Sequence, residues 1–297
     1  MRRDWTRRSF AAAGASALAT PAAAEDALAG IEGRLGGRIG VSVARRGARP
    51  ILTHRSGERF AMASTFKALL AAQALHAVEA GRIALEAMVP YAEADLLEHA
   101  PVTRARVREG QLSVRTLCTA IVTVSDNTAA NLLLEALGGP AAFTAFMRKI
   151  GDRVTRLDRI EPMLNENAPG DVRDATSPAA MRASLEAVLL SPRVLSPDAR
   201  MLLAAWMVSA NTGLRRLRAG LPPGWRIGDK TGTAARGANH DVAVCWPDRG
   251  PPLTIASFID APDASPAARE AAHAEIGRLV GGLWGRSAVG PAEGWSE

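Results

Sequence analysis

The sequence is poor in cysteine, which limits the disulfides and metal sites that it could form. Cys118 and Cys245 are the only two cysteines among 297 residues. At most one disulfide is therefore possible, and nothing in the spacing of the two residues indicates a metal site. Cys118 lies in an apolar run at residues 117–124, and Cys245 lies near the end of a strand-like segment at residues 242–246. We therefore predict two buried free thiols.

The sequence also lacks runs of basic residues interleaved with aromatic ones. Aromatic residues make up 4% of the chain, and the cations behind its formal net charge of +6 are scattered among acids. Nucleic-acid-binding surfaces concentrate positive charge, so we expect a solvated surface and no nucleic-acid partner. Beyond residue 24 no apolar stretch is long enough to span a bilayer, and we expect no membrane association of the processed protein.

Lysine is scarce, and this scarcity points to particular positions. The chain has 33 arginines but only three lysines, Lys67, Lys149 and Lys230. Arginine does not give up its proton in proteins, whereas the pKa of lysine can be lowered until it serves as a base. Lys149 follows Arg148 on a predicted helix, and we interpret it as a solvated cation. Lys67 and Lys230 are the candidates for proton transfer.

The N-terminal 24 residues have the pattern of an export signal. A basic start is followed by an alanine-rich stretch and by the small residues Ala22–Ala24, which form a cleavage pattern. Residues 6–10, Thr-Arg-Arg-Ser-Phe, also match a twin-arginine signal, with a plain secretory signal as the alternative. Because this segment holds four arginines and one aspartate, its removal lowers the formal charge from +6 to +3. We expect a bacterial protein that is exported to the periplasm or secreted.

Strand-like and helix-like segments are distributed unevenly along the rest of the chain. Five segments alternate or end in turns like strands, at residues 38–45, 50–54, 225–233, 240–246 and 253–259. An amphipathic helix is expected over residues 265–283, and residues 64–218 consist almost entirely of predicted helices and loops. This order predicts an α/β lobe built from both ends of the chain, residues 25–60 and 219–297, with an inserted all-helical lobe at 61–218.

Ser64 and Lys67 stand three residues apart where an apolar helix is expected to begin. That spacing places both side chains on one face of a helix. A serine hydroxyl becomes a useful nucleophile when a neighbouring group accepts its proton, and a desolvated amine can do so. A helix N-terminus also favours the oxyanion that such an attack creates. Taken alone, the pair fits equally well a serine that caps a helix beside a solvated lysine.

Two further motifs favour a catalytic role for Ser64 and Lys67. Ser125-Asp126-Asn127 follows it, and Lys230-Thr231-Gly232-Thr233 comes later on a predicted strand, where the glycine allows close approach to the backbone. The order Ser-x-x-Lys, Ser-Asp-Asn, Lys-Thr-Gly resembles the signature of class A serine β-lactamases and penicillin-binding proteins. The resemblance covers essentially the whole chain after the signal. It implies an α/β (α+β) fold with an antiparallel five-stranded sheet flanked by helices.

The resemblance also implies roles for the residues of these motifs. Ser64 would be the nucleophile, and Lys67 and Glu161 would both be candidates for the base of acylation, whose shares are disputed in this family. The backbone N–H groups of Ser64 and Thr233 would form the oxyanion hole. Ser125 would protonate the departing lactam nitrogen. No cofactor or metal is needed for this chemistry.

A long irregular stretch within the helical lobe resembles the Ω-loop of class A enzymes. Its Glu161-Pro-Met-Leu-Asn165 segment matches the loop's sequence, and Arg159 and Asp174 match the salt bridge that closes it. A carboxylate beside an amide can hold and deprotonate a water, so Glu161 and Asn165 would form the deacylation pair. By the same comparison Glu166 is an ordinary solvated acid.

The substrate contacts follow from the same resemblance. Asn127 would bind the amide side chain of a β-lactam, and the carboxylate of the substrate would be bound by Lys230, Thr231 and Thr233, with Gly232 between them as a further substrate-binding residue. Many class A enzymes add an arginine from the following strand, but that position is Asn239 here. Arg216 matches the alternative arginine of other branches, whereas Arg215 and Arg218 are expected to be solvated.

Two departures from the family pattern concern substrate range. His99 replaces the usual tyrosine at the edge of the site, where it could stack on substrate or be a plain surface imidazole. The best-known carbapenem-hydrolysing branch has a disulfide that would need cysteines at positions 63 and 234, where this chain has Ala63 and Ala234. Other members pair the residue equivalent to Cys118 with a second cysteine, but this chain has Ala71 at that position. The sequence therefore does not support carbapenem hydrolysis.

The resemblance implies hydrolysis of penicillin- and cephalosporin-type antibiotics by a monomer, and three alternatives remain. A penicillin-binding DD-peptidase shares the serine and lysine machinery but lacks the Glu161 and Asn165 pair. A β-lactam sensor that does not turn over would need a link to the membrane. A general serine esterase would make the Ω-loop match a coincidence.

Overall fold

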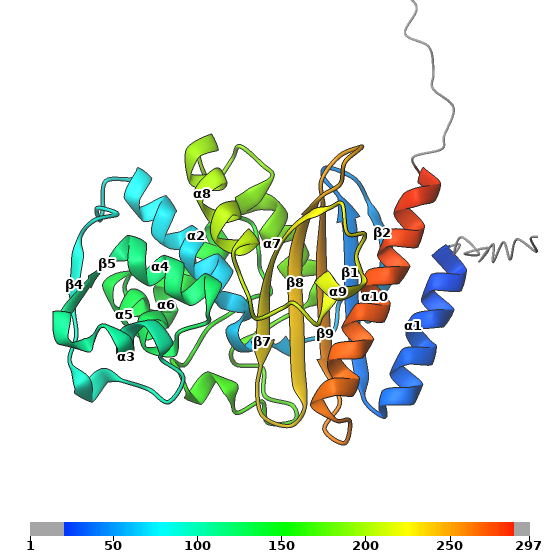
Figure 1. The fold of residues 1–297 in the computed structure, drawn as a ribbon, viewed down its shortest axis with the longest axis horizontal. Helices are drawn as coiled ribbons and strands as arrows, with labels where there is room; N and C mark the ends of the chain where they lie inside the picture. The colour runs from blue at the N-terminus through cyan, green and yellow to red at the C-terminus, as the bar shows by residue number, and fades with distance from the viewer. Residues whose placement is uncertain (1–20, 288–297) are drawn as a thin grey trace, which may run out of the picture.

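A single antiparallel sheet of five strands forms the centre of the molecule. The structure, a computed structural model, describes residues 21–287. The strands lie in the order β2-β1-β9-β8-β7, so both ends of the chain contribute to one sheet, as predicted (Figure 1). Their bounds are Arg38–Arg45 (β1), Pro50–His54 (β2), Arg226–Thr233 (β7), Ala238–Trp246 (β8) and Leu253–Asp260 (β9). Strand β7 forms the edge next to the helical lobe.

Helices from the two ends of the chain cover one face of the sheet. These are α1 (Pro21–Leu35), α10 (Pro266–Ser287) and the short α9 (Leu217–Gly220), at the right of Figure 1. They bury one hydrophobic core against the strands. Most of the predicted export signal lies outside the described residues, but its last four residues begin α1, and Ala24 is fully buried.

The helical lobe covers the other face. It consists of α2 (Phe66–Glu79), α3 (Pro101–Ala105), α4 (Val114–Thr123), α5 (Asn127–Ala136), α6 (Gly139–Lys149), α7 (Pro178–Leu189) and α8 (Pro197–Val208). Helix α2 is buried on nearly all sides and forms the centre of a second core. The lobe also contains two small sheets that pair β3 (Phe60–Ala61) with β6 (Ala175–Thr176) and β4 (Met88–Pro90) with β5 (Gln111–Ser113).

Short polar side chains begin several of these helices. Asp126, Ser113, Ser177 and Ser196 each accept a hydrogen bond from a backbone N–H in the first turn of α5, α4, α7 and α8, which is the role that such residues play at helix N-termini. The cap at Asp126 matters most for function, because it fixes the backbone between two predicted site residues, Ser125 and Asn127.

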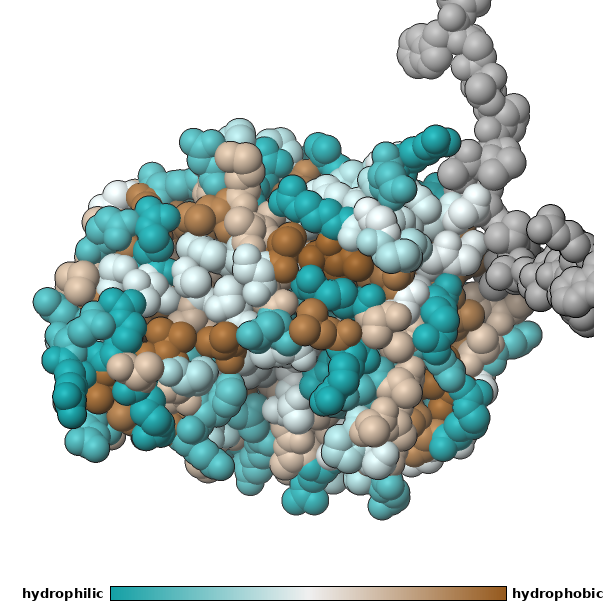
Figure 2. Space-filling view, in the orientation of Figure 1, coloured by the Kyte–Doolittle hydropathy of each residue, from teal (hydrophilic) through white to brown (hydrophobic). Residues whose placement is uncertain are grey.

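The burial of the two cysteines agrees with the sequence. Cys118 and Cys245 are free and fully buried, and burial raises the pKa of the Cys118 thiol to about 12. Within residues 21–287, no single helix is long and apolar enough to cross a membrane; the bent pair α5 and α6 meets that test only by length and composition. On the face drawn in Figure 2, hydrophobic residues form small groups separated by hydrophilic ones.

Candidate active site

Ser64 lies where the helical lobe meets the edge strand. It belongs to a 3-10 turn, Ala63–Thr65, that leads directly into α2. The preceding Ala63 has φ 44°, a left-handed conformation that is strained for a residue with a side chain. A Cβ at Gly232 of β7 would lie 2.9 Å from the Met62 carbonyl oxygen. Only glycine therefore lets β7 approach the turn that carries Ser64 this closely.

Lys67 is completely buried and is surrounded by oxygen atoms. Its Nζ lies 3.0 Å from Glu161 Oε1 and donates to the Ser125 carbonyl at 2.9 Å and to Asn127 Oδ1 at 2.5 Å. Burial lowers the pKa of Lys67, and the Glu161 carboxylate opposes that shift. Ser64 Oγ donates to the same Glu161 oxygen at 3.5 Å. The Glu161 carboxylate thus contacts both the Ser64 hydroxyl and the Lys67 amine.

The second buried lysine faces the same serine from the sheet. Lys230 Nζ donates to Ser125 Oγ at 3.1 Å, and Lys67 Nζ lies 3.4 Å from that oxygen. Burial and the neighbouring Lys67 hold the pKa of Lys230 well below its usual range. The Ser125 hydroxyl therefore lies between two amines and can pass a proton between either of them and a bound molecule.

The Ω-loop brings a carboxylate and an amide to the same centre. Asn165 Nδ2 donates to Glu161 Oε2 at 2.5 Å, and Glu161 is 2% exposed. The side chain of Asn131 on α5 fixes the loop at this point, because it accepts from Glu161 N and donates to Glu161 O, both at 2.9 Å. The sequence analysis did not identify Asn131, since a lone asparagine on a helix carries no motif.

The predicted salt bridge closes the loop and has more partners than expected. Arg159 Nε donates to Asp174 Oδ2 at 2.5 Å, and Asp174 Oδ1 also accepts from the backbone N–H of Arg159 at 2.9 Å. The same guanidinium contacts Asp171 and Glu166. Glu166 is half exposed, as expected of a solvated acid, but it is also paired.

These side chains open onto a cleft of about 300 Å³. It is lined by Ser64, His99, Ser125, Asn127, Asn165, Thr212, Arg216, Thr231 and Thr233. Arg216 is 6% exposed; its guanidinium donates to the Gly232 and His240 carbonyls at 3.0 and 2.6 Å and to Thr233 Oγ1 at 2.8 Å. The cleft thus offers several hydroxyls and a fixed cation beside Ser64. Within residues 21–287, no group of three or more His, Cys, Asp or Glu side chains could hold a metal ion.

Comparison with known proteins decides what this arrangement is. A family model described as the β-lactamase enzyme family matches residues 23–284. The chain belongs to the β-lactamase enzyme family. It is 44% identical to β-lactamase FAR-1 of Nocardia farcinica, over 85% of this chain and 80% of the relative. It is also 44% identical to β-lactamase L2 of Stenotrophomonas maltophilia, over 92% of this chain and 91% of the relative.

Solved structures place it among the class A enzymes. The class A β-lactamase of the last common ancestor of Gram-negative bacteria is 51% identical, with a TM-score of 0.85 over 87% of this chain and 98% of that one. The putative class A β-lactamase PenP of Rhodopseudomonas palustris is 45% identical, with a TM-score of 0.85 over 88% and 99% of the two chains. This chain is therefore a class A serine β-lactamase, a hydrolase that opens the β-lactam ring and confers resistance to antibiotics.

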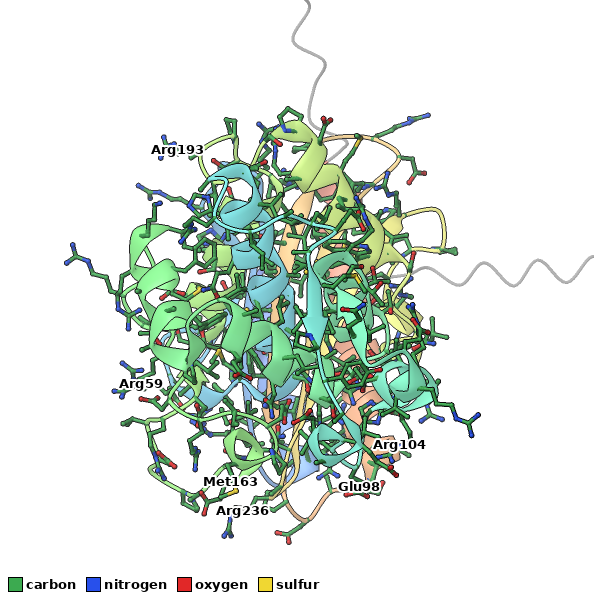
Figure 3. All side chains as sticks on the ribbon, turned by 90° about the vertical axis from the view of Figure 1, so that its left-hand side faces the viewer. Arg59, Glu98, Arg104, Met163, Arg193 and Arg236 are labelled. Carbon is green, nitrogen blue, oxygen red and sulfur yellow. The ribbon has the colours of Figure 1, made fainter. Side chains whose placement is uncertain are left out.

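The two sides of the β-lactamase cleft come from different parts of the fold. Asn165 of the Ω-loop lines it together with Thr231 and Thr233 of β7. In Figure 3, Met163 of the same loop lies near Arg236 of the β7–β8 turn, and Glu98 and Arg104 lie to their right. His99 follows Glu98, is exposed and lines the cleft, with its Nε2 3.0 Å from the Val124 carbonyl. It thus occupies the predicted edge position.

Three arginine and lysine assignments can be compared with the β-lactamase structure. Lys149 is exposed, as predicted, with Nζ 3.0 Å from His76 Nε2. Arg215 is also exposed, although it pairs with Glu270. The expectation that Arg218 is solvated was wrong, because its side chain is 21% exposed and pairs with the buried Asp229. A buried carboxylate on an edge strand is not recognisable from the sequence near Arg218.

Proposed function

We propose that this β-lactamase acts through an acyl-enzyme on Ser64. The Ser64 hydroxyl loses its proton toward the Lys67 and Glu161 pair, and its oxygen attacks the lactam carbonyl. The 3.5 Å contact of Ser64 Oγ with Glu161 and the 3.0 Å contact of Glu161 with Lys67 support this step. The backbone N–H groups of Ser64 and Thr233 bind the oxyanion.

Ring opening requires a proton for the lactam nitrogen. Ser125 supplies it and recovers a proton from Lys67 or Lys230, both of which lie within 3.4 Å of its oxygen. Burial lowers the pKa of both lysines. A lysine with a lowered pKa gives up its proton to Ser125 more readily. Once the ring is open, the released amine moves away from the ester and the step does not reverse.

Deacylation is the step that makes the protein an antibiotic-hydrolysing enzyme rather than a penicillin-binding protein. Glu161, oriented by Asn165 and Asn131, deprotonates a water that attacks the Ser64 ester. The observation that carries the proposal is that one carboxylate contacts the nucleophile, the buried lysine and the Asn165 amide.

Penicillins and cephalosporins are the proposed substrates. Their common carboxylate is bound by Lys230, Thr231, Thr233 and Arg216, and their amide side chain by Asn127 with His99 at the edge. Gly232 keeps the strand backbone open to the substrate. The absence of cysteines at Ala63 and Ala234 gives no support for carbapenem hydrolysis. We further propose that the enzyme is exported to the periplasm or secreted through residues 1–24 and works as a monomer.

Glu161→Gln tests the mechanism. Mixed with excess benzylpenicillin, it should accumulate an adduct of one opened penicillin on Ser64, detected by intact-protein mass spectrometry, while the wild type returns to its free mass. Glu166→Gln is the matched control, because it removes a nearby, half-exposed loop carboxylate that pairs with Arg159 and is not among the residues lining the cleft. Unchanged turnover in Glu161→Gln would exclude Glu161 as the deacylation base.

A further inference from the structure

Two carboxyl groups lie buried together on the face of the sheet opposite to Lys230. Asp229 on β7 and Asp241 on β8 are both fully buried. In the antiparallel register Asp241 stands opposite Thr231, two residues from Asp229. The two aspartates are therefore diagonal neighbours on one face, which brings long or polar side chains within reach of each other.

Each carboxyl has one oxygen with a donor and one without. Asp229 Oδ1 accepts from Arg218, and Asp241 Oδ2 accepts from Leu217 N at 3.0 Å. Among the described residues, Asp229 Oδ2 and Asp241 Oδ1 have no hydrogen-bond partner, although both are buried. The backbone of Gly213 covers Asp229 Oδ2 so closely that a Cβ there would collide with it.

Two buried carboxylate oxygens without donors are costly to the folded state. A single proton shared by the two carboxyl groups would reduce this cost, because a protonated carboxyl can donate to a carboxylate within its reach. Burial raises the pKa of Asp229, and burial together with the Asp229 carboxylate raises the pKa of Asp241 well above its usual range. Two like charges in one low-dielectric site favour that protonation.

Of the two guanidinium groups near the pair, those of Arg218 and Arg216, only that of Arg218 donates a hydrogen bond to an aspartate among the described residues. Arg218 pairs with Asp229, and Arg216 lies close enough to both aspartates to be influenced by them. The imidazole of His273 is neutral, because burial holds its pKa well below its usual range. The other titratable groups that influence this cluster are Lys230 on the cleft face, Cys245 on β8 and Glu270 on α10.

We propose that Asp229 and Asp241 share one proton and together act as positioning residues for Arg216. Asp241 holds the backbone N–H of Leu217, and Asp229 holds the side chain of Arg218, so the pair fixes the chain on the C-terminal side of Arg216. With one negative charge between two guanidinium groups, the cluster keeps an excess positive charge beside the cleft. This inference rests on the proposed role of Arg216 in binding the substrate carboxylate.

Infrared spectroscopy tests the shared proton without reference to activity. At neutral pH the wild type should have a carbonyl band of a protonated carboxyl group that shifts in D₂O and is absent from Asp241→Asn. Asp263→Asn, which removes an exposed carboxylate, should keep the band. If the wild type and Asp241→Asn do not differ in this region, Asp241 does not take part in holding a proton and the proposal is wrong.

Kinetics test the positioning role. Asp241→Asn reproduces the protonated carboxyl, so its KM for benzylpenicillin should stay within about 2-fold of the wild type. Asp241→Leu leaves Leu217 N without an acceptor and should raise KM by about 10-fold while kcat changes by less than about 3-fold. An equal rise in KM for both variants would overturn the shared proton, and an unchanged KM in Asp241→Leu would overturn the positioning role.

Arg216→Ala separates the two proposals. If it leaves KM unchanged, the proposed carboxylate contact of Arg216 fails, while the infrared result still decides whether the aspartates share a proton. If Asp241→Leu does not fold, the infrared comparison and the KM of Asp241→Asn remain decisive.

Discussion

The buried charged residues on the two faces of strand β7 have different kinds of partner. On the cleft face, Lys230 and Lys67 are fully buried and point their amines at Ser125, beside the Glu161 carboxylate. On the opposite face, Asp229 is equally buried, but its charged partner is an arginine on the adjacent α9. In the mechanism that we propose, the two buried lysines stand where protons move, and Arg218 stands where a charge stays fixed.

This difference follows from side-chain alternation along one strand. Neighbouring residues of a strand point to opposite faces, so Asp229 and Lys230 enter different environments although they are adjacent in sequence. The Lys230 amine meets Ser125, whereas the Asp229 carboxyl is covered by Gly213 and paired with Arg218. The comparison predicts large catalytic effects on one face and effects on stability and binding on the other.

The largest expected effect is on acylation, when Lys67 is replaced by arginine. Lys67→Arg keeps the charge but removes a group that can release a proton, so the acylation rate should fall by at least about 10³-fold. Stopped-flow measurement of acylation checks this. Lys149→Arg is the matched control on a solvated lysine and should keep the wild-type rate. Near-normal acylation in Lys67→Arg would remove Lys67 from the proton path.

The Arg159–Asp174 pair of the Ω-loop should contribute to stability because it is buried. Asp174 is 1% and Arg159 14% exposed, so Arg159→Ala leaves a buried carboxylate unpaired and should destabilise the loop by about 3 kcal/mol. Urea unfolding should detect this loss if the loop unfolds together with the rest of the molecule. Arg115→Ala, which breaks the exposed pair with Glu86, should cost less than about 1 kcal/mol. Equal costs would contradict the burial argument.

Acid should destabilise the fold through two buried histidines, His273 on α10 and His240 on the opposite face of the sheet. Burial lowers the pKa of His240 to about 4 and that of His273 well below its usual range. The unfolded chain therefore binds protons that the native state does not, and stability is lost as pH falls below about 6.5, by about 1.4 kcal/mol per pH unit for each histidine. Urea unfolding at pH 7 and 5 should reveal this loss, and His273→Gln should remove part of it. An identical pH dependence in the variant would exclude His273.

The smallest expected effect is on the KM of Arg216 variants. Arg216 uses two nitrogens to contact three oxygens, which a single ammonium cannot reproduce. Arg216→Lys should raise KM for benzylpenicillin by a few-fold and leave deacylation unchanged, as measured by steady-state and single-turnover kinetics. Arg215→Lys, on an exposed neighbour, should change neither. A fall in kcat of the same size as the rise in KM would mean that Arg216 acts on the chemical step.

Most of the fold follows from periodicity. The hairpin of β1 and β2, the three late strands and the C-terminal helix lie within a few residues of their predicted bounds, because alternation and turn residues are local signals. The helix expected to begin near Ser64 is preceded by a 3-10 turn. The small β3–β6 and β4–β5 sheets were not predicted, since strands of two or three residues carry no measurable period.

The candidate site was predicted from motifs, and its supporting residues were not. Ser64, Lys67 and Lys230 were recognisable because lysine is scarce in this chain and because three motifs together resemble the signature of a known family. Asn131 and the Asp229–Asp241 pair were not, because their roles depend on which elements pack together. Arg218 was misinterpreted for the same reason.

The sequence by itself determined the kind of chemistry, because a nucleophilic serine, two lysines among many arginines and an Ω-loop glutamate are properties of residue type and local spacing. The tertiary structure decided which of these charges meet. Lys67, Ser125, Glu161 and Lys230 come from separate parts of the chain and converge only when β7 packs against the turn before α2. Their burial, and hence the lowered pKa of both lysines, is a property of that packing, since desolvation depends on every neighbouring element and not on the local sequence.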